Sequence, residues 1–228
     1  MKNLNLVSYQ KQINDHKEQF ETYFEELISY NEKVNLTAIV EKNEVFTKHF
    51  LDSILGMDAI PFQANVVDVG TGAGFPSLPL KIVRPDINIT MVDSLNKRIN
   101  FLNYLCSKLN IQATNVHARA EDFAKNNREK FDVALARAVA KLNTLLEYLL
   151  PLVKVGGYVI AYKGSNYEEE LAGATNAIKI LGGKFVKTLK FNLPNETGER
   201  NILIIEKISN TPIKYPRNKN LPKIEPII

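Results

Sequence analysis

An apolar strand that runs directly into three closely spaced glycines is the feature that most constrains this chain. Residues 66–69 are apolar apart from one aspartate, and the glycines that follow are Gly70, Gly72 and Gly74. A second apolar run, at 87–92, ends on Asp93. Glycine lets the backbone turn sharply and approach a ligand, and a carboxylate ending the next strand accepts hydrogen bonds from ribose hydroxyls. The pattern predicts a parallel α/β sheet that holds a nucleoside-like ligand at its carboxyl edge.

The spacing of these glycines narrows the type of ligand. A dinucleotide fingerprint reads G-x-G-x-x-G, whereas here the third glycine comes one position early and Phe75 stands in the fingerprint's last glycine position. No G-K-[ST] follows, so the loop is not a phosphate-binding P-loop. A loop without lysine or arginine suits a ligand without phosphates. The arrangement resembles motif I of the class I S-adenosylmethionine methyltransferases, and the alternative is a Rossmann-like turn that binds no ligand.

The order of predicted elements indicates the fold. We expect a helical cap over 1–60, a Rossmann-like domain over 61–208 and an extended, basic, proline-rich tail over 209–228. The expected strands are 66–69, 88–93, 113–118, 131–136, 157–162, 184–191 and 201–207, and the expected helices of this domain are 76–84, 95–109, 141–153 and 167–181. The turn-rich segment 194–198 suits a closing antiparallel hairpin. The predicted class is α/β, with a mostly parallel seven-stranded sheet flanked by helices and preceded by a helical extension.

Composition excludes several other classes of protein. No apolar run approaches the ~20 residues that span a bilayer, and the first residues lack the apolar core of a signal peptide. One cysteine allows no internal disulfide, and three scattered histidines give no metal-ligand spacing. We therefore expect a cytoplasmic monomer with no metal and no membrane partner.

The net charge of +4 is unevenly distributed. Residues 1–65 carry six lysines against ten acids, whereas residues 66–208 carry nineteen lysines and arginines against fourteen acids, and the last twenty carry four against one. A positive Rossmann-like domain and tail suit a polyanionic partner. The alternative is that so small an excess serves only solubility.

Polar residues at predicted strand ends form the candidate site. Ala120 and Glu121 follow the third strand, beside the expected adenine position, and a cofactor role is favoured over the alternative of acids at a helix N-terminus. Arg137 ends the fourth strand, Lys163 ends the fifth and Arg200 opens the last. Three cations around one crevice suit a phosphate-bearing substrate, and the alternative is a set of exposed strand-end charges.

Several segments together resemble the RsmG (GidB) family, bacterial methyltransferases that act on guanine N7 of 16S ribosomal RNA. The segments, which span nearly the whole chain, are Asn35-Leu36-Thr37, His49 with Asp52-Ser53, 68–76, 92–98, 119–121, 136–138, 163–164 and 214–217. The resemblance implies S-adenosyl-L-methionine as cofactor and 16S ribosomal RNA or the small ribosomal subunit as partner. It also implies that Gly70, Phe75, Ala120, Glu121 and Arg137 contact the cofactor. Its place at the end of a strand assigns Arg137 to the RNA instead, and both assignments stay open.

The implied chemistry needs no catalytic base. Guanine N7 has a free lone pair and no proton, so methyl transfer depends mainly on alignment. The sequence identifies no catalytic residue, and His49 on an apolar helix face is more often a buried, hydrogen-bonded histidine than a site residue. Two other functions remain as alternatives: a small-molecule methyltransferase with the cap as a lid, and a non-catalytic RNA-binding assembly protein.

Overall fold

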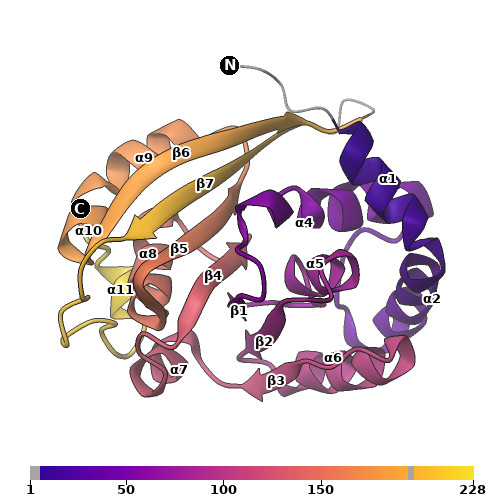
Figure 1. The fold of residues 1–228 in the computed structure, drawn as a ribbon. Helices are drawn as coiled ribbons and strands as arrows, with labels where there is room; N and C mark the ends of the chain where they lie inside the picture. The colour runs from indigo at the N-terminus through magenta and orange to yellow at the C-terminus, as the bar shows by residue number, and fades with distance from the viewer. Residues whose placement is uncertain (1–5, 195–197) are drawn as a thin grey trace.

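A seven-stranded sheet forms the centre of the computed structural model, which describes residues 6–194 and 198–228 (Figure 1). The strand order is β3-β2-β1-β4-β5-β7-β6, and all neighbours are parallel except β7, which is antiparallel to β5 and β6. The strands are β1 Asn65–Val69, β2 Asn88–Asp93, β3 Thr114–His117, β4 Phe131–Arg137, β5 Val153–Lys163, β6 Gly183–Asn192 and β7 Glu199–Lys207. The predicted class is therefore confirmed. Residues 195–197 of the predicted hairpin turn lie outside the described residues.

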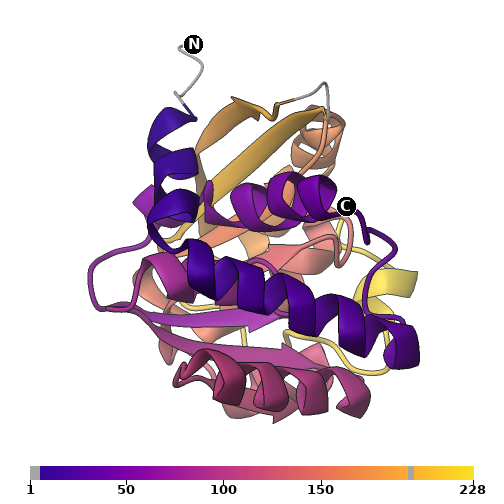
Figure 2. The same cartoon turned by 90° about the vertical axis from the view of Figure 1, so that its right-hand side faces the viewer.

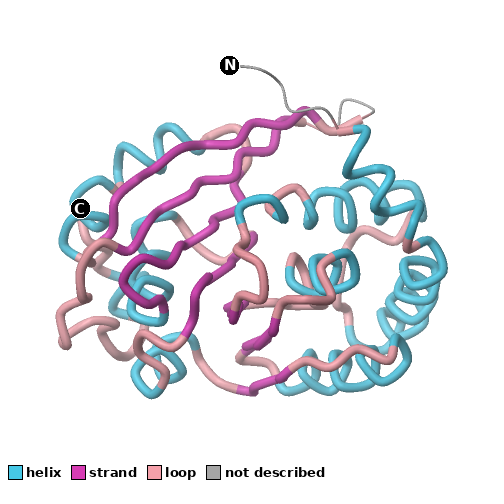
Figure 3. Tube along the Cα trace, in the orientation of Figure 1, coloured by secondary structure: helices cyan, strands magenta, loops and turns pink. Residues whose placement is uncertain are grey.

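Side chains of the central strands alternate between two hydrophobic cores. Val66 of β1 and Leu135 of β4 belong to the core on one face, while Val67, Val69 and Ala136 belong to the core on the other. This period of two follows from the pleat of a strand. Both faces are covered by helices, as Figure 3 shows, so the central strands read as nearly continuous apolar runs.

The helices divide between these two faces. The core that contains Val66 also contains side chains from α5 Ser77–Val83 and α6 Asn96–Leu109. Helices on the other face are α7 Ala120–Asn126, α8 Leu142–Leu149, the 3-10 turn η3 Leu150–Leu152, α9 Tyr167–Gly173 and α10 Thr175–Ile180.

The N-terminal cap is a further layer on the α6 side. Its elements are α1 Val7–Asp15, α2 Lys17–Val34, α3 Lys42–Glu44, the π-helix η1 Val45–Leu51, α4 Asp52–Ile54 and the 3-10 turn η2 Met57–Ala59. Figure 2 shows α1 and α2 in front of the sheet, with α6 below α2. Phe20, Tyr23 and Phe50 are fully buried and share one core with the sheet residues. Helix α4 of the cap also packs against α5, the helix that follows β1.

Three segments differ from the predicted elements. Helix α7 was not among the expected helices, because seven residues are too short for a clear helical period. Strand β5 begins at Val153, four residues before the expected start at 157, so Gly156 and Gly157 lie within a strand, beside a register irregularity. The expected helix 167–181 is divided into α9 and α10 at Ala174.

The last residues fold back onto the domain, so the predicted extended tail is wrong. Thr211, Tyr215 and Pro222 are buried, and Leu221–Ile224 forms the short helix α11 (yellow in Figure 1) beside α8. Arg217 binds the fully buried carboxylate of Glu147 on α8. The segment lacks periodicity because single residues and hydrogen bonds, not an apolar face, hold it in place.

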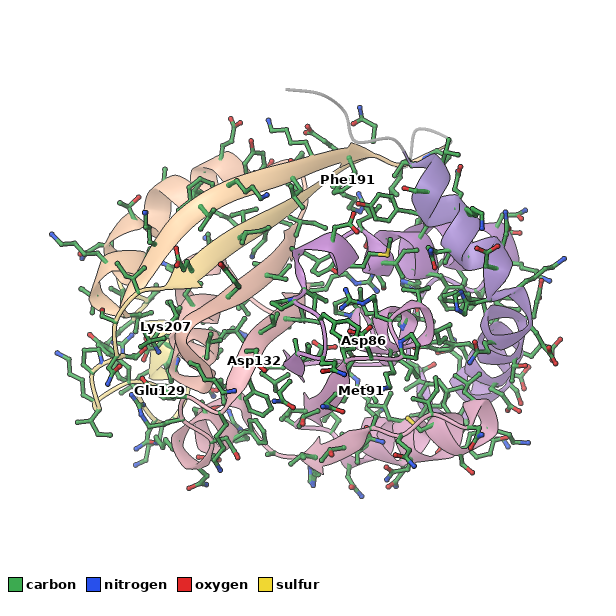
Figure 4. The ribbon with its side chains drawn as sticks, in the orientation of Figure 1. Asp86, Met91, Glu129, Asp132, Phe191 and Lys207 are labelled. Carbon is green, nitrogen blue, oxygen red and sulfur yellow. The ribbon has the colours of Figure 1, made fainter. Side chains whose placement is uncertain are left out.

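A buried lysine lies at the sheet edge where the parallel strands begin. Lys207, at the end of β7, is fully buried and donates to the carbonyl oxygens of Leu150 and Val153 at 2.6 and 3.2 Å. Its Nζ is 3.6 Å from the carboxylate of Glu129, and Figure 4 shows the two side chains in this region. Burial lowers the pKa of Lys207 to about 8. This group is structural, since the predicted site lies at the opposite edge.

Candidate active site

The loop after β1 needs glycine for two distinct reasons. Gly70 and Gly74 have φ angles of 76° and 98°, a region that L side chains rarely adopt. A Cβ atom on Gly70 would lie 2.8 Å from Cγ2 of Val139, and one on Gly74 would lie 2.7 Å from the Tyr23 hydroxyl. The loop is therefore packed between the segment after β4 and the helical cap.

Asp93 is held in place at the end of β2. Its carboxylate is buried and accepts hydrogen bonds from the amides of Gly72 at 3.0 Å and Leu95 at 2.9 Å. Arg98 pairs with the same carboxylate at 3.1 Å. The glycine loop and the acid, which are separate signals in sequence, are one hydrogen-bonded unit in the structure.

A cavity of about 330 Å³, here called the β1–β2 pocket, opens beside this unit. The residues that line it include four predicted cofactor residues: Gly70, Asp93, Ala120 and Glu121. Gly72 and Gly74 do not line the pocket: the Gly72 amide donates to Asp93, and Gly74 lies under the cap. Tyr148 of α8 also lines the pocket. No sequence signal marked this tyrosine, because α8 follows a different strand.

The acids of this pocket are neutralised by neighbouring arginines. Glu121 is buried and pairs with Nε of Arg119 at 2.9 Å, as Asp93 pairs with Arg98. Glu121 also lies in the first turn of α7, so the helix N-terminus and the pocket, which the sequence offered as alternatives, coincide.

Two further predicted cofactor residues, Phe75 and Arg137, also lie outside the β1–β2 pocket. Phe75 is buried between the rings of Tyr23 and His49, at centroid distances of 5.4 and 4.5 Å. The guanidinium carbon of Arg137 lies 5.0 Å from the centroid of the Phe75 ring. The phenylalanine therefore links the cap to the end of β4.

A second cavity, of about 580 Å³ and here called the β4–β5 pocket, brings together the three predicted substrate cations. Arg137, Lys163 and Arg200 all line it, together with Lys48 and Lys141. The two pockets share Ala138 and Val139 in their walls, so this short segment separates them.

Two carboxylates that were not among the predicted site residues pair with these cations. Asp52, on α4, lies 2.7 Å from Nη1 of Arg137 and 3.2 Å from Nε of Arg200. Glu170, on α9, lies 2.6 Å from Nζ of Lys163, which also donates to the carbonyl oxygen of Ala140. Both acids come from helices, so the order of strands carried no signal for them.

His49 is both hydrogen-bonded and part of the β4–β5 pocket wall. Nη2 of Arg137 lies 3.3 Å from its Nδ1, and its Nε2 lies 2.8 Å from Oγ1 of Thr37. A guanidinium only donates, so Nδ1 accepts and Nε2 carries the proton. Burial, and then the charge of Arg137, lower the pKa of His49 to about 4. The imidazole is therefore neutral at physiological pH.

Asp68, directly before the glycine loop, is fully buried. Its Oδ2 accepts a hydrogen bond from Ser77 at 2.6 Å. Burial raises the pKa of this carboxyl to about 6, against the opposing effects of its hydrogen bonds and of Arg137. The group ties β1 to the start of α5.

Two kinds of feature are absent from residues 6–194 and 198–228. No group of three or more histidine, cysteine, aspartate or glutamate side chains there is arranged to hold a metal ion. No helix in that part of the chain is long and apolar enough to cross a membrane.

Several solved structures share this fold, and some of them are named as methyltransferases. M. jannaschii TYW2, solved in complex with AdoMet, aligns with a TM-score of 0.56 at 15% identity, covering 70% of this chain and 76% of that one. The Methanococcus jannaschii fibrillarin pre-rRNA processing protein aligns with a TM-score of 0.51 at 15% identity, covering 64% and 67%. At this identity the likeness concerns the fold alone.

Sequence relatives are much closer. The ribosomal RNA small subunit methyltransferase G of an Exiguobacterium species is 51% identical, covering 92% of this chain and 90% of that protein. The protein of the same name from Lactobacillus johnsonii is 47% identical, covering 97% and 96%. The model of the GidB family, rRNA small subunit methyltransferase G, matches residues 16–202. The predicted family is confirmed: this chain belongs to the rRNA small subunit methyltransferase G family.

Proposed function

We propose that this protein transfers the methyl group of S-adenosyl-L-methionine to N7 of a guanine in 16S ribosomal RNA. The observation that carries the proposal is the pair of pockets that meet at Ala138 and Val139. One is lined by two acids, each paired with an arginine, beside a glycine loop, and the other by five cations against two acids. A methyl donor in the first and a guanine in the second would meet at the shared wall. Family membership supplies the reaction class.

The residues of the β1–β2 pocket fit the nucleoside part of the cofactor. Asp93 would accept hydrogen bonds from the ribose hydroxyls, while Ala120 and Glu121 would bind the edge of the adenine ring. Each acid already has an arginine partner, so the pocket is close to neutral, as a ligand without phosphates requires. When bound, the cofactor supplies a methyl group on a positively charged sulfur.

The β4–β5 pocket fits a nucleotide of the RNA. We assign Arg137, Lys163 and Arg200 to it, as cations that attract and position the phosphate backbone. A volume of about 580 Å³ is within the range of small-molecule sites and is large enough to receive a base taken out of its stack.

Catalysis on this view is alignment without a base. The cofactor would supply an electrophilic methyl group, and guanine N7 would accept it through its free lone pair, with the positive charge passing from sulfur to the purine ring. No proton moves, which agrees with the bonding of His49: its Nδ1 accepts from Arg137 and its Nε2 donates to Thr37. The protein's part is to hold nitrogen, carbon and sulfur in line.

The test is methyl transfer to RNA from cells that lack this gene. Purified protein is incubated with tritiated S-adenosyl-L-methionine and either small ribosomal subunits or free 16S RNA, and the label is mapped by cleavage at 7-methylguanine. Label at one guanine supports the proposal. Cofactor binding without transfer to either RNA favours a non-catalytic assembly protein, and transfer only to an RNA-free extract favours a small-molecule methyltransferase.

We further infer that the protein acts in the cytoplasm as a monomer. One chain contributes both pockets and the wall between them, so no second copy is needed to complete the site. Light scattering of the purified protein, alone and with S-adenosylhomocysteine, tests the monomer, and cell fractionation tests the location.

A further inference from the structure

We propose that the C-terminal segment, residues 209–228, is part of the cofactor site, because Asn220 positions Glu121 through Arg119. The inference rests on the proposed function, since it takes the ligand of the β1–β2 pocket to be S-adenosyl-L-methionine. The family model ends at residue 202, so this segment lies beyond the matched region.

The segment is anchored beside the pocket by buried groups. Glu147 on α8 is fully buried and accepts three hydrogen bonds from Arg217: from the backbone amide at 2.8 Å, from Nε at 2.9 Å and from Nη2 at 2.7 Å. Arg128 donates to the carbonyl oxygens of Thr211 and Tyr215, both at 2.5 Å. These bonds fix the path of the chain on both sides of residue 216.

Asn220 connects this anchored segment to the pocket wall. Nη2 of Arg119 donates to Oδ1 of Asn220 at 2.5 Å, and Nε of the same guanidinium pairs with Glu121 at 2.9 Å. Asn220 has a left-handed φ of 61° at the start of α11, a conformation that asparagine tolerates better than most residues. The arginine is therefore held at both ends of its guanidinium.

The second contact matters because Arg119 is otherwise loosely held. Its side chain is 54% exposed, whereas that of Glu121 is 6% exposed. An exposed ion pair contributes little, since two long side chains must be ordered to form it and water screens the charges. The Asn220 carboxamide orders the guanidinium in advance, and the arginine then fixes the carboxylate that faces the adenine position. Asn220 and Arg119 are thus positioning residues for the cofactor.

Helix α8 also connects the C-terminal segment to the β1–β2 pocket. Glu147 holds the tail, and the next residue on α8, Tyr148, lines the β1–β2 pocket. The proposal concerns Asn220 because its contact reaches the pocket acid through a single side chain, and because its removal leaves the Arg217–Glu147 anchor intact.

The test uses the full chain and calorimetric titration with S-adenosylhomocysteine, which binds without reacting. Asn220→Gly keeps the left-handed backbone and removes the carboxamide, and we expect roughly three- to tenfold weaker binding, as for the indirect loss of a charge-assisted hydrogen bond. Asn220→Asp keeps an acceptor for Arg119 and should bind like wild type. Asn218→Gly is the matched control: it removes an exposed asparagine of the same segment that does not contact Arg119.

A double-mutant cycle with Arg119→Ala separates positioning from general stability. If Asn220 acts through Arg119, Asn220→Gly has no further effect in the Arg119→Ala background. In methyl-transfer assays the KM for S-adenosyl-L-methionine should rise, while the KM for RNA and the unfolding temperature stay at wild-type values.

Other results would overturn the proposal. Equal binding by wild type and Asn220→Gly removes it, as does an undiminished effect of Asn220→Gly when Arg119 is already alanine. A raised KM for RNA instead would make the segment a polyanion-binding arm. A wild-type protein that binds no S-adenosylhomocysteine would refute the proposed cofactor itself, which is a separate failure.

Discussion

The carboxylate of Asp52 and the guanidinium of Arg137 form an ion pair of 2.7 Å across 85 positions of the sequence. The pair joins the helical cap to the end of β4, and both residues line the β4–β5 pocket. Neither group is well exposed, and Asp52 is the charge partner of both Arg137 and Arg200.

Asp52→Asn should therefore destabilise the protein. It leaves Arg137 and Arg200 near one another without their shared carboxylate, and breaking a buried pair is costly because the remaining charge is unpaired. We expect the free energy of unfolding to fall by about 2 to 4 kcal/mol in urea titrations. Asp15→Asn, which breaks the exposed pair with Lys11, is the control and should change it by less than about 0.5 kcal/mol. Equal effects of the two substitutions would contradict the structural role of Asp52.

Arg137→Lys should separate RNA binding from cofactor binding. Arg137 lines the β4–β5 pocket and not the β1–β2 pocket, and one ammonium cannot reproduce its contacts with both Asp52 and His49. We expect kcat/KM for RNA to fall by about 100-fold or more, with S-adenosylhomocysteine affinity changed by less than about threefold. Asp93→Asn should instead lower the affinity for S-adenosylhomocysteine more than it lowers kcat/KM for RNA. If Arg137→Lys weakens cofactor binding as much as Asp93→Asn does, Arg137 belongs to the cofactor.

The pH dependence of stability should change when His49 is replaced. Its pKa is lowered from 6.5 to about 4, so between these values the unfolded chain binds more protons, and His49 costs stability as the pH falls. His49→Gln removes this cost. Relative to wild type, the variant should gain about 1 to 2 kcal/mol between pH 7 and pH 4.5, measured by urea unfolding at each pH.

The stability of wild type alone would not isolate the effect of His49, because Asp68 titrates in the same pH range with the opposite effect. Its pKa is raised to about 6, so the folded protein binds the extra proton, and Asp68 adds stability as the pH falls through the same range. The two groups offset one another in wild type. A free-energy difference between wild type and His49→Gln that stays constant with pH would show that the histidine is not held neutral by the fold.

Salt should weaken RNA binding steeply if the cations of the β4–β5 pocket bind phosphates. The logarithm of the affinity should fall linearly with the logarithm of salt concentration, and Arg200→Ala should reduce the slope by about one for each phosphate that the arginine neutralises. Fluorescence anisotropy with a labelled fragment of 16S RNA measures both slopes. Lys11→Ala, on α1 and outside the pocket, is the control. A slope unchanged by Arg200→Ala would remove this residue from the RNA interface.

The sequence alone determined the sheet and the position of the site. Strand residues alternate or run apolar according to their burial, and glycine at positive φ is a requirement of the backbone itself, so β1, its loop and Asp93 were identifiable locally. The carboxyl ends of parallel strands share one edge, so Arg137 and Lys163 could be placed near one another from the order of strands alone.

Only the tertiary structure decided which groups neutralise these charges and how the chain ends. Asp52, Glu170 and Glu147 face their partners because helices from other parts of the chain pack there, and no local preference encodes those distances. The C-terminal segment is the clearest case. It has no periodic apolar face, and its conformation depends on the buried carboxylate of Glu147, 70 residues before its partner Arg217. Local patterns fix elements whose stability is local, whereas ion pairs between distant segments exist only after packing has removed both groups from water.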